Sequence, residues 1–234
     1  MPHKPIVIVS ALYTEIAPLL RGRRGKWLDG VELFEVDSAV VGLGGIGKKA
    51  ARRAAQTLVD YARPELVVAA GSAGAVSPKL KAGAVGWARE VVEAETGNRY
   101  PTRCGDWLVV TAQAVSGPAE KQAFLLQYGA EVVDMESSAV AQVAYERGLE
   151  FAAVKAISDE ADFVMPPLGR FVDEDGRFAT GGFVRYIALR PQLWSAVSQL
   201  RTNTRVAAAN LCWAVEHLIA GYTTSSREQK VPLA

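Results

Sequence analysis

VVDMESSAVAQVAYERGLEFAAVKAISDEAD, residues 132–162, decides the fold class of this chain. After a short extended segment and the acidic turn at residues 134–138, apolar residues recur at the spacing of one helical face: Ala139, Val140, Val143 and Ala144. Gly148 is placed to end that helix. The apolar run Phe151–Ile157 is typical of a strand that is covered on both faces. Strand end, helix and buried strand together predict one unit of a parallel α/β sheet.

Three acidic residues of this stretch follow the ends of its two strands. Asp134 and Glu136 come after the first strand, and Asp159 comes after the second. Parallel sheets bind ligands at the carboxyl ends of their strands, so we expect these acids to face a common crevice. The alternative is that they are N-cap and first-turn acids, which favour helix N-termini without any ligand.

The remainder of the chain alternates strands with helices. Buried-strand patterns are followed by polar turns or helical patterns, and Pro64 ends the helix that follows the first glycine cluster. We expect strands at residues 6–9, 31–36, 39–43, 66–70, 84–92 and 107–112, an exposed loop at 93–106, and helices at 119–128, 186–188, 192–200 and 205–219. This order predicts an α/β fold with three layers, αβα, around a mixed, largely parallel central sheet.

Length and composition indicate one globular domain. The chain has 234 residues, is half hydrophobic and carries a net charge of +1. We expect a single domain over residues 1–222 and a frayed polar tail over residues 223–234. The net charge gives no electrostatic case for binding to nucleic acid or to an anionic membrane, and no apolar run approaches the roughly 20 residues of a membrane span. The N-terminus lacks a signal-peptide pattern, so a cytoplasmic protein is expected.

Histidine and cysteine usage narrows the chemistry. The two histidines, His3 and His217, lie near the ends of the chain, and Cys104 and Cys212 are isolated. Catalysis that pairs His with Ser or Cys, and most zinc sites, therefore have no support. We expect no metal and no cofactor, and carboxylates as the acid–base groups of any enzyme.

The glycine cluster Gly42–Gly47, GLGGIG, matches two nucleotide-binding motifs only in part. The dinucleotide fingerprint GxGxxG needs an acid at the end of the next strand, but that strand runs into Gly71 and Ser72. The P-loop pattern fails at Lys49, where Ser or Thr must hold magnesium. The glycines either allow close packing of helix on strand or line a small-molecule site with their amides.

Five segments in order resemble the nucleoside phosphorylase/nucleosidase superfamily. They are SALYTE (10–15), GGIGK (44–48), AAGSAGAV (69–76), VVDMESSAVA (132–141) and KAISDEAD (155–162). The nearest branch by motif is the methylthioadenosine/S-adenosylhomocysteine nucleosidases. The Asp-Met-Glu-Ser form, the pair Pro166-Pro167 and Arg190-Pro191 are similar, more loosely, to the hopanoid-associated phosphorylases, which act on an adenosyl lipid precursor.

The resemblance implies cleavage of the bond between ribose C1′ and a purine, with adenine the expected base. Asp159 would protonate or hydrogen-bond N7 of the leaving base, and Glu15 would orient or deprotonate a water. Glu136 with Met135 would hold the ribose hydroxyls. The remaining residues implied in substrate binding are Ser72, Gly71, Ser158 and Gly45. The resemblance also implies a small-molecule nucleoside as substrate and a homo-oligomer.

Water is favoured over phosphate as the nucleophile. In the hexameric phosphorylases of the superfamily an arginine stands two residues before the Gly-Ser of the third motif, at the position where this chain has Ala69. Glu15 stands in the region of a second phosphate-binding arginine, and a carboxylate repels phosphate. Lys48, Arg21 and Arg23 leave phosphorolysis open, and a non-catalytic nucleoside-binding protein is the alternative from another class.

The residue that would stack on the base is not evident. The nucleosidases place an aromatic residue shortly before the Met-Glu motif, and Val115 occupies the matching stretch here. Four phenylalanines after Asp162 are candidates to cover a base or a hydrophobic 5′ group, although core or loop packing is the simpler interpretation for each: Phe163, Phe171, Phe178 and Phe183.

Overall fold

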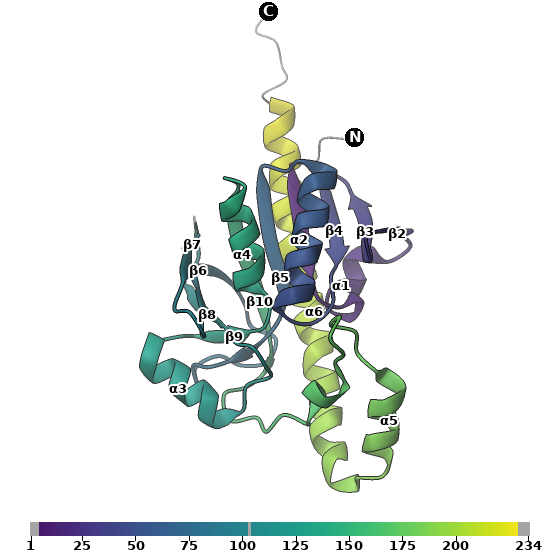
Figure 1. The fold of residues 1–234 in the computed structure, drawn as a ribbon, viewed down its shortest axis with the longest axis vertical. Helices are drawn as coiled ribbons and strands as arrows, with labels where there is room; N and C mark the ends of the chain where they lie inside the picture. The colour runs from purple at the N-terminus through teal and green to yellow at the C-terminus, as the bar shows by residue number, and fades with distance from the viewer. Residues whose placement is uncertain (1–4, 103, 229–234) are drawn as a thin grey trace, which may run out of the picture.

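The computed structural model describes residues 5–102 and 104–228, and a ten-stranded sheet with helices against both faces forms its centre (Figure 1). The strands are β1 (Ile6–Ser10), β2 (Lys26–Leu28), β3 (Val31–Val36), β4 (Ala39–Leu43), β5 (Leu66–Ala75), β6 (Val85–Glu93), β7 (Arg99–Pro101), β8 (Trp107–Thr111), β9 (Val132–Asp134) and β10 (Glu150–Asp159). The helices are α1 (Tyr13–Leu20), α2 (Lys48–Ala62), α3 (Pro118–Tyr128), α4 (Ser137–Glu146), η1 (Leu168–Phe171), α5 (Thr180–Ala188), η2 (Pro191–Leu193) and α6 (Trp194–Glu228).

The strand order is β10-β6-β8-β9-β5-β1-β4-β3-β2, with β7 beside β6. Strand β10 pairs with β5 as well as β6, so β5, β10, β6, β8 and β9 close into a ring. The central strands β4, β1, β5 and β10 run parallel, while β2 and β3 extend the sheet antiparallel. The mixed sheet between helices confirms the predicted α/β class.

Helices cover both faces of the parallel strands, which is why those strands are apolar without alternation. In β1, Val7 and Val9 pack into the core cluster under α2 and α4, whereas Ile6 and Ile8 pack into the cluster under α1 and α6. Every residue of β1 is buried as a result.

Strand register brings three chain segments to one edge of the sheet. Val9 of β1 pairs with Ala69 of β5, and Lys155 of β10 pairs with Gly71. The chain leaves β1 at Ser10 beside this level and turns into α1. The carboxyl ends of the parallel strands therefore meet, as the topology of such sheets requires for a binding site.

Two strands are longer than the sequence pattern predicted. Gly71–Ala75, expected as a loop, continues β5, and Ser158 and Asp159 continue β10. The extensions hold because both sides of β5 keep partners there, with Ser72 against Ala156 and Gly74 against Val133. The expected exposed loop at residues 93–106 also contains a short strand, β7, which pairs with β6.

The C-terminal helices also differ from expectation. Residues 194–228 form one helix, α6, rather than separate helices at 192–200 and 205–219, and α5 begins at Thr180 rather than at residue 186. The polar residues at 202–204 are weak helix formers, and packing of α6 against the sheet overrides that weakness. The expected frayed tail is helical as far as Glu228; His3 and residues 229–234 lie outside the described residues. Within the described helices, no segment has the length and apolarity of a bilayer span.

Candidate active site

A small cavity lies where β1, β5 and β10 end beneath the glycine cluster. Its volume of about 10 Å³ is room for roughly one water molecule, far below the roughly 300–1,000 Å³ of usual ligand pockets. Its lining comes from widely separated parts of the chain: Val9, Ser10, Ala11, Glu15, Gly45, Ala51, Ala69, Ala70, Gly71, Glu136 and Lys155. Four predicted site residues, Glu15, Glu136, Gly45 and Gly71, therefore share one cavity.

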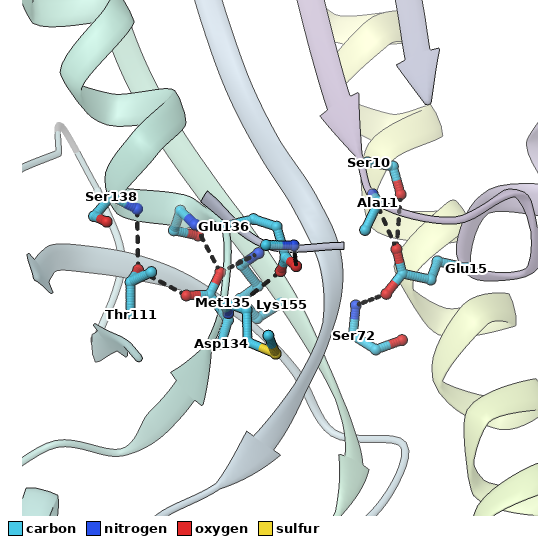
Figure 2. Close-up of polar contacts among 12 residues, drawn as sticks. Ser10, Ala11, Glu15, Ser72, Thr111, Asp134, Met135, Glu136, Ser138 and Lys155 are labelled. Atoms are coloured by element: carbon cyan, nitrogen blue, oxygen red, sulfur yellow. Dashed lines mark hydrogen bonds and ion pairs between the residues drawn. The ribbon is translucent and has the colours of Figure 1, made fainter. Parts of the chain in front are cut away.

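Glu15 is held in the cavity wall by donors from two strands and its own helix. One carboxylate oxygen accepts hydrogen bonds from the Ser10 hydroxyl (3.0 Å) and from the amides of Ala11 (3.2 Å) and Leu12 (3.1 Å). The other oxygen accepts the Ser72 amide at 2.9 Å (Figure 2). The bond to Ser72 crosses to β5, so Glu15 is more than a first-turn acid of α1. This network fixes the orientation of the carboxylate.

Glu136 is held across the cavity from a second direction. Its Oε1 accepts the amide of Gly47 at 2.8 Å, and its Oε2 accepts the amide of Met135 at 3.3 Å. The donor at Gly47 belongs to the glycine cluster, whose positive φ of 92° there favours glycine. Gly47 therefore holds a protein carboxylate beside the cavity, whereas Gly42 and Gly44 allow α2 to pack closely, since an added Cβ would lie 2.4 Å from Leu58 and 2.7 Å from Ala54.

The pKa of Glu136 is raised to about 7. Burial is the main cause, and the charges of Asp134 and Glu15 add to it, while Lys155 and the Gly47 amide oppose it. A carboxyl group with this pKa can hold or release a proton near neutral pH, as acid–base chemistry requires.

Lys155 and Asp134 form a buried ion pair behind Glu136. The Lys155 ammonium lies 2.7 Å from Asp134 Oδ2, and both side chains are almost fully buried. Burial alone would lower the pKa of Lys155, yet the neighbouring carboxylates raise it above its usual value. Burial likewise opposes the charge of Asp134, but Lys155 lowers its pKa overall, with help from the Ser137 amide and the Thr111 hydroxyl.

The two interpretations of the acids are thus divided between residues. Asp134 accepts the amide of Ser137 at 2.9 Å and so caps the start of α4, which the capping alternative predicted. Glu136 bonds instead to the distant glycine cluster and lines the cavity. A single crevice for all three acids is not what the structure shows, because Asp134 and Asp159 do not line this cavity.

Asp159 is engaged by a second buried lysine. Its Oδ2 lies 2.5 Å from the ammonium of Lys121, and its Oδ1 accepts the Ser158 hydroxyl at 2.7 Å. Lys121 also donates to the carbonyl of Glu160 at 2.8 Å. A Cβ added at Gly74 would lie 2.9 Å from Asp159 Oδ2, so this glycine gives the pair room against β5. Both carboxylate oxygens of Asp159 therefore have protein partners.

The remaining predicted site residues, Ser72, Met135 and Ser158, lie beside Glu15, Glu136 and Asp159. The Ser72 hydroxyl is buried and has no hydrogen-bond partner among the described residues. Met135 is partly buried beside Glu136 (Figure 2), and Ser158 adjoins Asp159. The Ser72 amide binds Glu15, whereas Ser72 is not among the residues that line the cavity.

Residues 173–177 form a surface segment that lies against the glycine cluster. The carbonyl of Gly176 accepts the amide of Ile46 at 2.8 Å, and a Cβ at Gly45 would lie 3.0 Å from the same carbonyl. Arg53 adds a bond to the carbonyl of Asp175. The segment therefore narrows the cavity on the side of Gly45.

Sequence reasoning missed both buried lysines. Lys155 had a signal, since a lysine inside a strand that is apolar on both faces must find a buried acid. Lys121 had none, because it occurs in an ordinary polar helix pattern and its partner lies in another element. Within the residues that the structure describes, no group of three or more His, Cys, Asp or Glu is arranged to hold a metal ion.

The family follows from comparison with known proteins. The model of the phosphorylase superfamily matches residues 22–107 and 86–178, which is more than half of the chain. The chain therefore belongs to the phosphorylase superfamily.

Solved structures of similar fold include nucleosidases and a hydrolase. The 5′-methylthioadenosine/S-adenosylhomocysteine nucleosidase of Colwellia psychrerythraea, in complex with adenine, matches with a TM-score of 0.70 and 18% identity over 94% of this chain and 97% of that one. The corresponding nucleosidase of Helicobacter pylori matches with 0.67 and 17% over 93% and 100%. Futalosine hydrolase of Helicobacter pylori matches with 0.66 and 17% over 91% and 97%. At these identities the similarity is one of fold.

Proposed function

We propose that this protein hydrolyses the N-glycosidic bond of a purine nucleoside whose base is adenine. The observation that carries the proposal is one cavity lined by Glu15 and Glu136, beside the unpartnered hydroxyl of Ser72. Carboxylates on the sugar side favour the positive charge that develops on the ribose ring as the bond breaks. The adenine-bound nucleosidase of similar fold supports the choice of base.

Each acidic group has a distinct part in the proposed reaction. Glu15, whose orientation is fixed by four donors, takes a proton from a water that attacks C1′. Glu136 accepts hydrogen bonds from the ribose hydroxyls. The electrons of the C1′–N bond leave with the base, and the base gains a proton at N7 that the Lys121 ammonium gives up through Asp159. The products are free base and free sugar.

The path from the cavity to Asp159 follows β5. Gly71 lines the cavity and Gly74 faces Asp159, three residues further along the strand. A strand rises about 3.3 Å per residue, so the separation is roughly 10 Å, on the order of the length of a nucleoside. The sugar would lie at Gly71 and Ser72, and the base would extend towards Asp159 and Lys121.

The charges around the cavity support water rather than phosphate. Among the residues that line it, Lys155 is the one cation, and it is already paired with Asp134. Glu15 and Glu136 face the same space and would repel a phosphate dianion. Ala69, at the position where the hexameric phosphorylases have an arginine, supplies no positive charge for phosphate.

Three further properties are part of the proposal. Residues 1–222 act as one domain, the protein is cytoplasmic, and it works as a homo-oligomer. Mixed-sheet architecture around one core supports the first. The other two rest on the family, and light scattering of the purified chain tests the oligomer directly.

The decisive experiment is product analysis with and without phosphate. The protein is incubated with methylthioadenosine, adenosine or inosine, and free base and sugar are separated by chromatography. Phosphate-independent release of adenine is expected, and ribose-1-phosphate as product would overturn hydrolysis. Binding by calorimetry without turnover would indicate the non-catalytic alternative.

Matched variants locate the activity in the cavity. Glu15→Gln and Glu136→Gln are each expected to lower kcat/KM by about 10²–10⁴-fold, since a general acid or base contributes that much. Glu174→Gln, on the exposed surface segment, is the control and should retain the wild-type rate. Equal activity in all three variants would place the chemistry elsewhere.

A further inference from the structure

Residues 177–194, here called the distal lobe, project away from the sheet. The lobe comprises α5 and η2, and neither element has a buried residue. Figure 1 shows α5 and the turn into α6 at the end of the molecule opposite the C-terminus. Surface area is therefore exposed here without a partner in the chain.

The inner side of the lobe is already packed. Phe183 lies 5.4 Å from Phe171 and from Phe178 between ring centroids, and Tyr186 lies 5.4 Å from Phe171. The guanidinium of Arg190 stacks 3.7 Å from the centre of the Tyr186 ring. These contacts account for Phe171, Phe178 and Phe183, three of the four phenylalanines that the sequence offered as covers for a base, and they hold the lobe in one shape.

The outer side of the lobe is apolar as well. Val184, Leu189 and Trp194 are 59%, 72% and 54% exposed. The indole N–H of Trp194 donates to the carbonyl of Ile187 at 2.9 Å, so its one polar atom has a partner while the ring faces outward. A helix in water normally carries polar residues on its outer face. On the outer face of α5, Arg185 is the one large polar side chain.

Charge is distributed unevenly around this lobe. Residues 176–215 contain five arginines and no Asp, Glu or Lys, although the whole chain has a net charge of only +1. The nearest acids, Asp173, Glu174 and Asp175, lie where the segment returns to the body at Ile46 and Arg53. Three of the five arginines, Arg177, Arg185 and Arg190, belong to the lobe, which is thus both basic and apolar.

We propose that the distal lobe is a docking surface for the anionic phospholipids of a bilayer. Arginines bind lipid phosphates with paired hydrogen bonds, and Leu189, Val184 and the Trp194 ring enter the boundary between headgroups and acyl chains. Tryptophan is enriched at that boundary. The attachment is peripheral and independent of the proposed catalytic activity.

Charge complementarity favours a bilayer over a second copy of the chain. In a two-fold dimer each patch faces the same patch of its partner. The arginines of two lobes would then oppose each other without any acid between residues 176 and 215 to pair with them. An anionic lipid surface has no such conflict.

Vesicle co-sedimentation of the full chain tests the proposal. Vesicles of phosphatidylcholine with phosphatidylglycerol are expected to retain the protein, and phosphatidylcholine alone is not. The variant with Leu189→Ser and Trp194→Ser, and the variant with Arg177→Gln and Arg185→Gln, are each expected to lose binding by at least about 10-fold. Added salt should weaken binding of the wild type.

The matched control removes equally exposed apolar residues elsewhere. Trp27 and Leu126 are 70% and 80% exposed on β2 and α3, and the variant with Trp27→Ser and Leu126→Ser should bind like the wild type. Circular dichroism checks that all variants are folded. No binding to phosphatidylglycerol vesicles, equal loss in the control, or lobe variants that only dissociate an oligomer would each overturn the proposal.

Discussion

The two buried lysines of this molecule have similar surroundings and different consequences. Lys155 and Lys121 each lie within 2.7 Å of an aspartate oxygen, with almost fully buried side chains on both partners. Lys155 also has Glu136 and Glu15 nearby, so three acids share one cation. Lys121 has Asp159 and a carbonyl oxygen.

The first group contains more acids than cations. Burial is the main cause that raises the pKa of Glu136 to about 7, and the charges of Asp134 and Glu15 add to it because the one lysine neutralises only Asp134. In the second group one cation meets one anion, so the pair is balanced within the protein. The balanced pair of Lys121 and Asp159 holds α3 against β10. The pair contacts a substrate only if the purine base binds beside it.

The largest expected effect comes from breaking the balanced pair. Lys121→Met leaves Asp159 buried without its cation, and the free energy of unfolding should fall by about 3–5 kcal/mol. Adding Asp159→Leu should restore most of that loss, because both charges are then gone. Urea unfolding measures both variants, and activity of the double variant should be lost if Asp159 serves the leaving base.

The control for that comparison is an exposed pair. Lys81 lies 2.8 Å from Glu160 with 70% of its side chain exposed, so Lys81→Met should leave the free energy of unfolding almost unchanged. If Lys121→Met is no more destabilising than Lys81→Met, the buried pair has no structural role.

A smaller effect is expected from the pH dependence of Glu136. Its pKa is raised from the usual 4.5 to about 7, so the folded state binds this proton more tightly than the unfolded state. The free energy of unfolding should therefore fall as pH rises from about 4.5 to about 7, by about 3 kcal/mol at most, with no further loss above that range. Unfolding at several pH values, compared with Glu136→Gln, isolates the contribution. Parallel curves for the two proteins would contradict it.

The smallest effect on stability is expected at Ser72. Its buried hydroxyl has no partner among the described residues, so Ser72→Ala should change the free energy of unfolding by less than about 1 kcal/mol. If the hydroxyl binds the sugar, kcat/KM should still fall by about 10-fold, which is the worth of one hydrogen bond. Thermal unfolding and nucleoside hydrolysis are measured on the same sample. A large loss of stability would instead assign the hydroxyl a structural role.

Local sequence patterns predicted much of the fold but only part of the candidate site. The apolar runs at β1 and β10 predicted buried parallel strands because both faces of such strands are covered. The resemblance implied that Glu15, Glu136 and Asp159 serve one substrate; Glu15 and Glu136 line one cavity, whereas Asp159 does not line it. The glycines at 71 and 74 indicated a loop, because turn chemistry is local whereas the strand partners that keep β5 extended come from β9 and β10.

The sequence by itself determined the alternation of strands and helices, the acids that follow the strand ends and the absence of acids from residues 176–215. Only the tertiary structure decided which acids share a cavity, that Lys121 holds Asp159, and that the basic and apolar residues of the distal lobe stand together at one end of the molecule. The physical reason is the distance along the chain over which each interaction acts. Hydrophobic periodicity acts over a few residues of one element, whereas the partner of a buried charge is set by the register and packing of elements far apart in the chain.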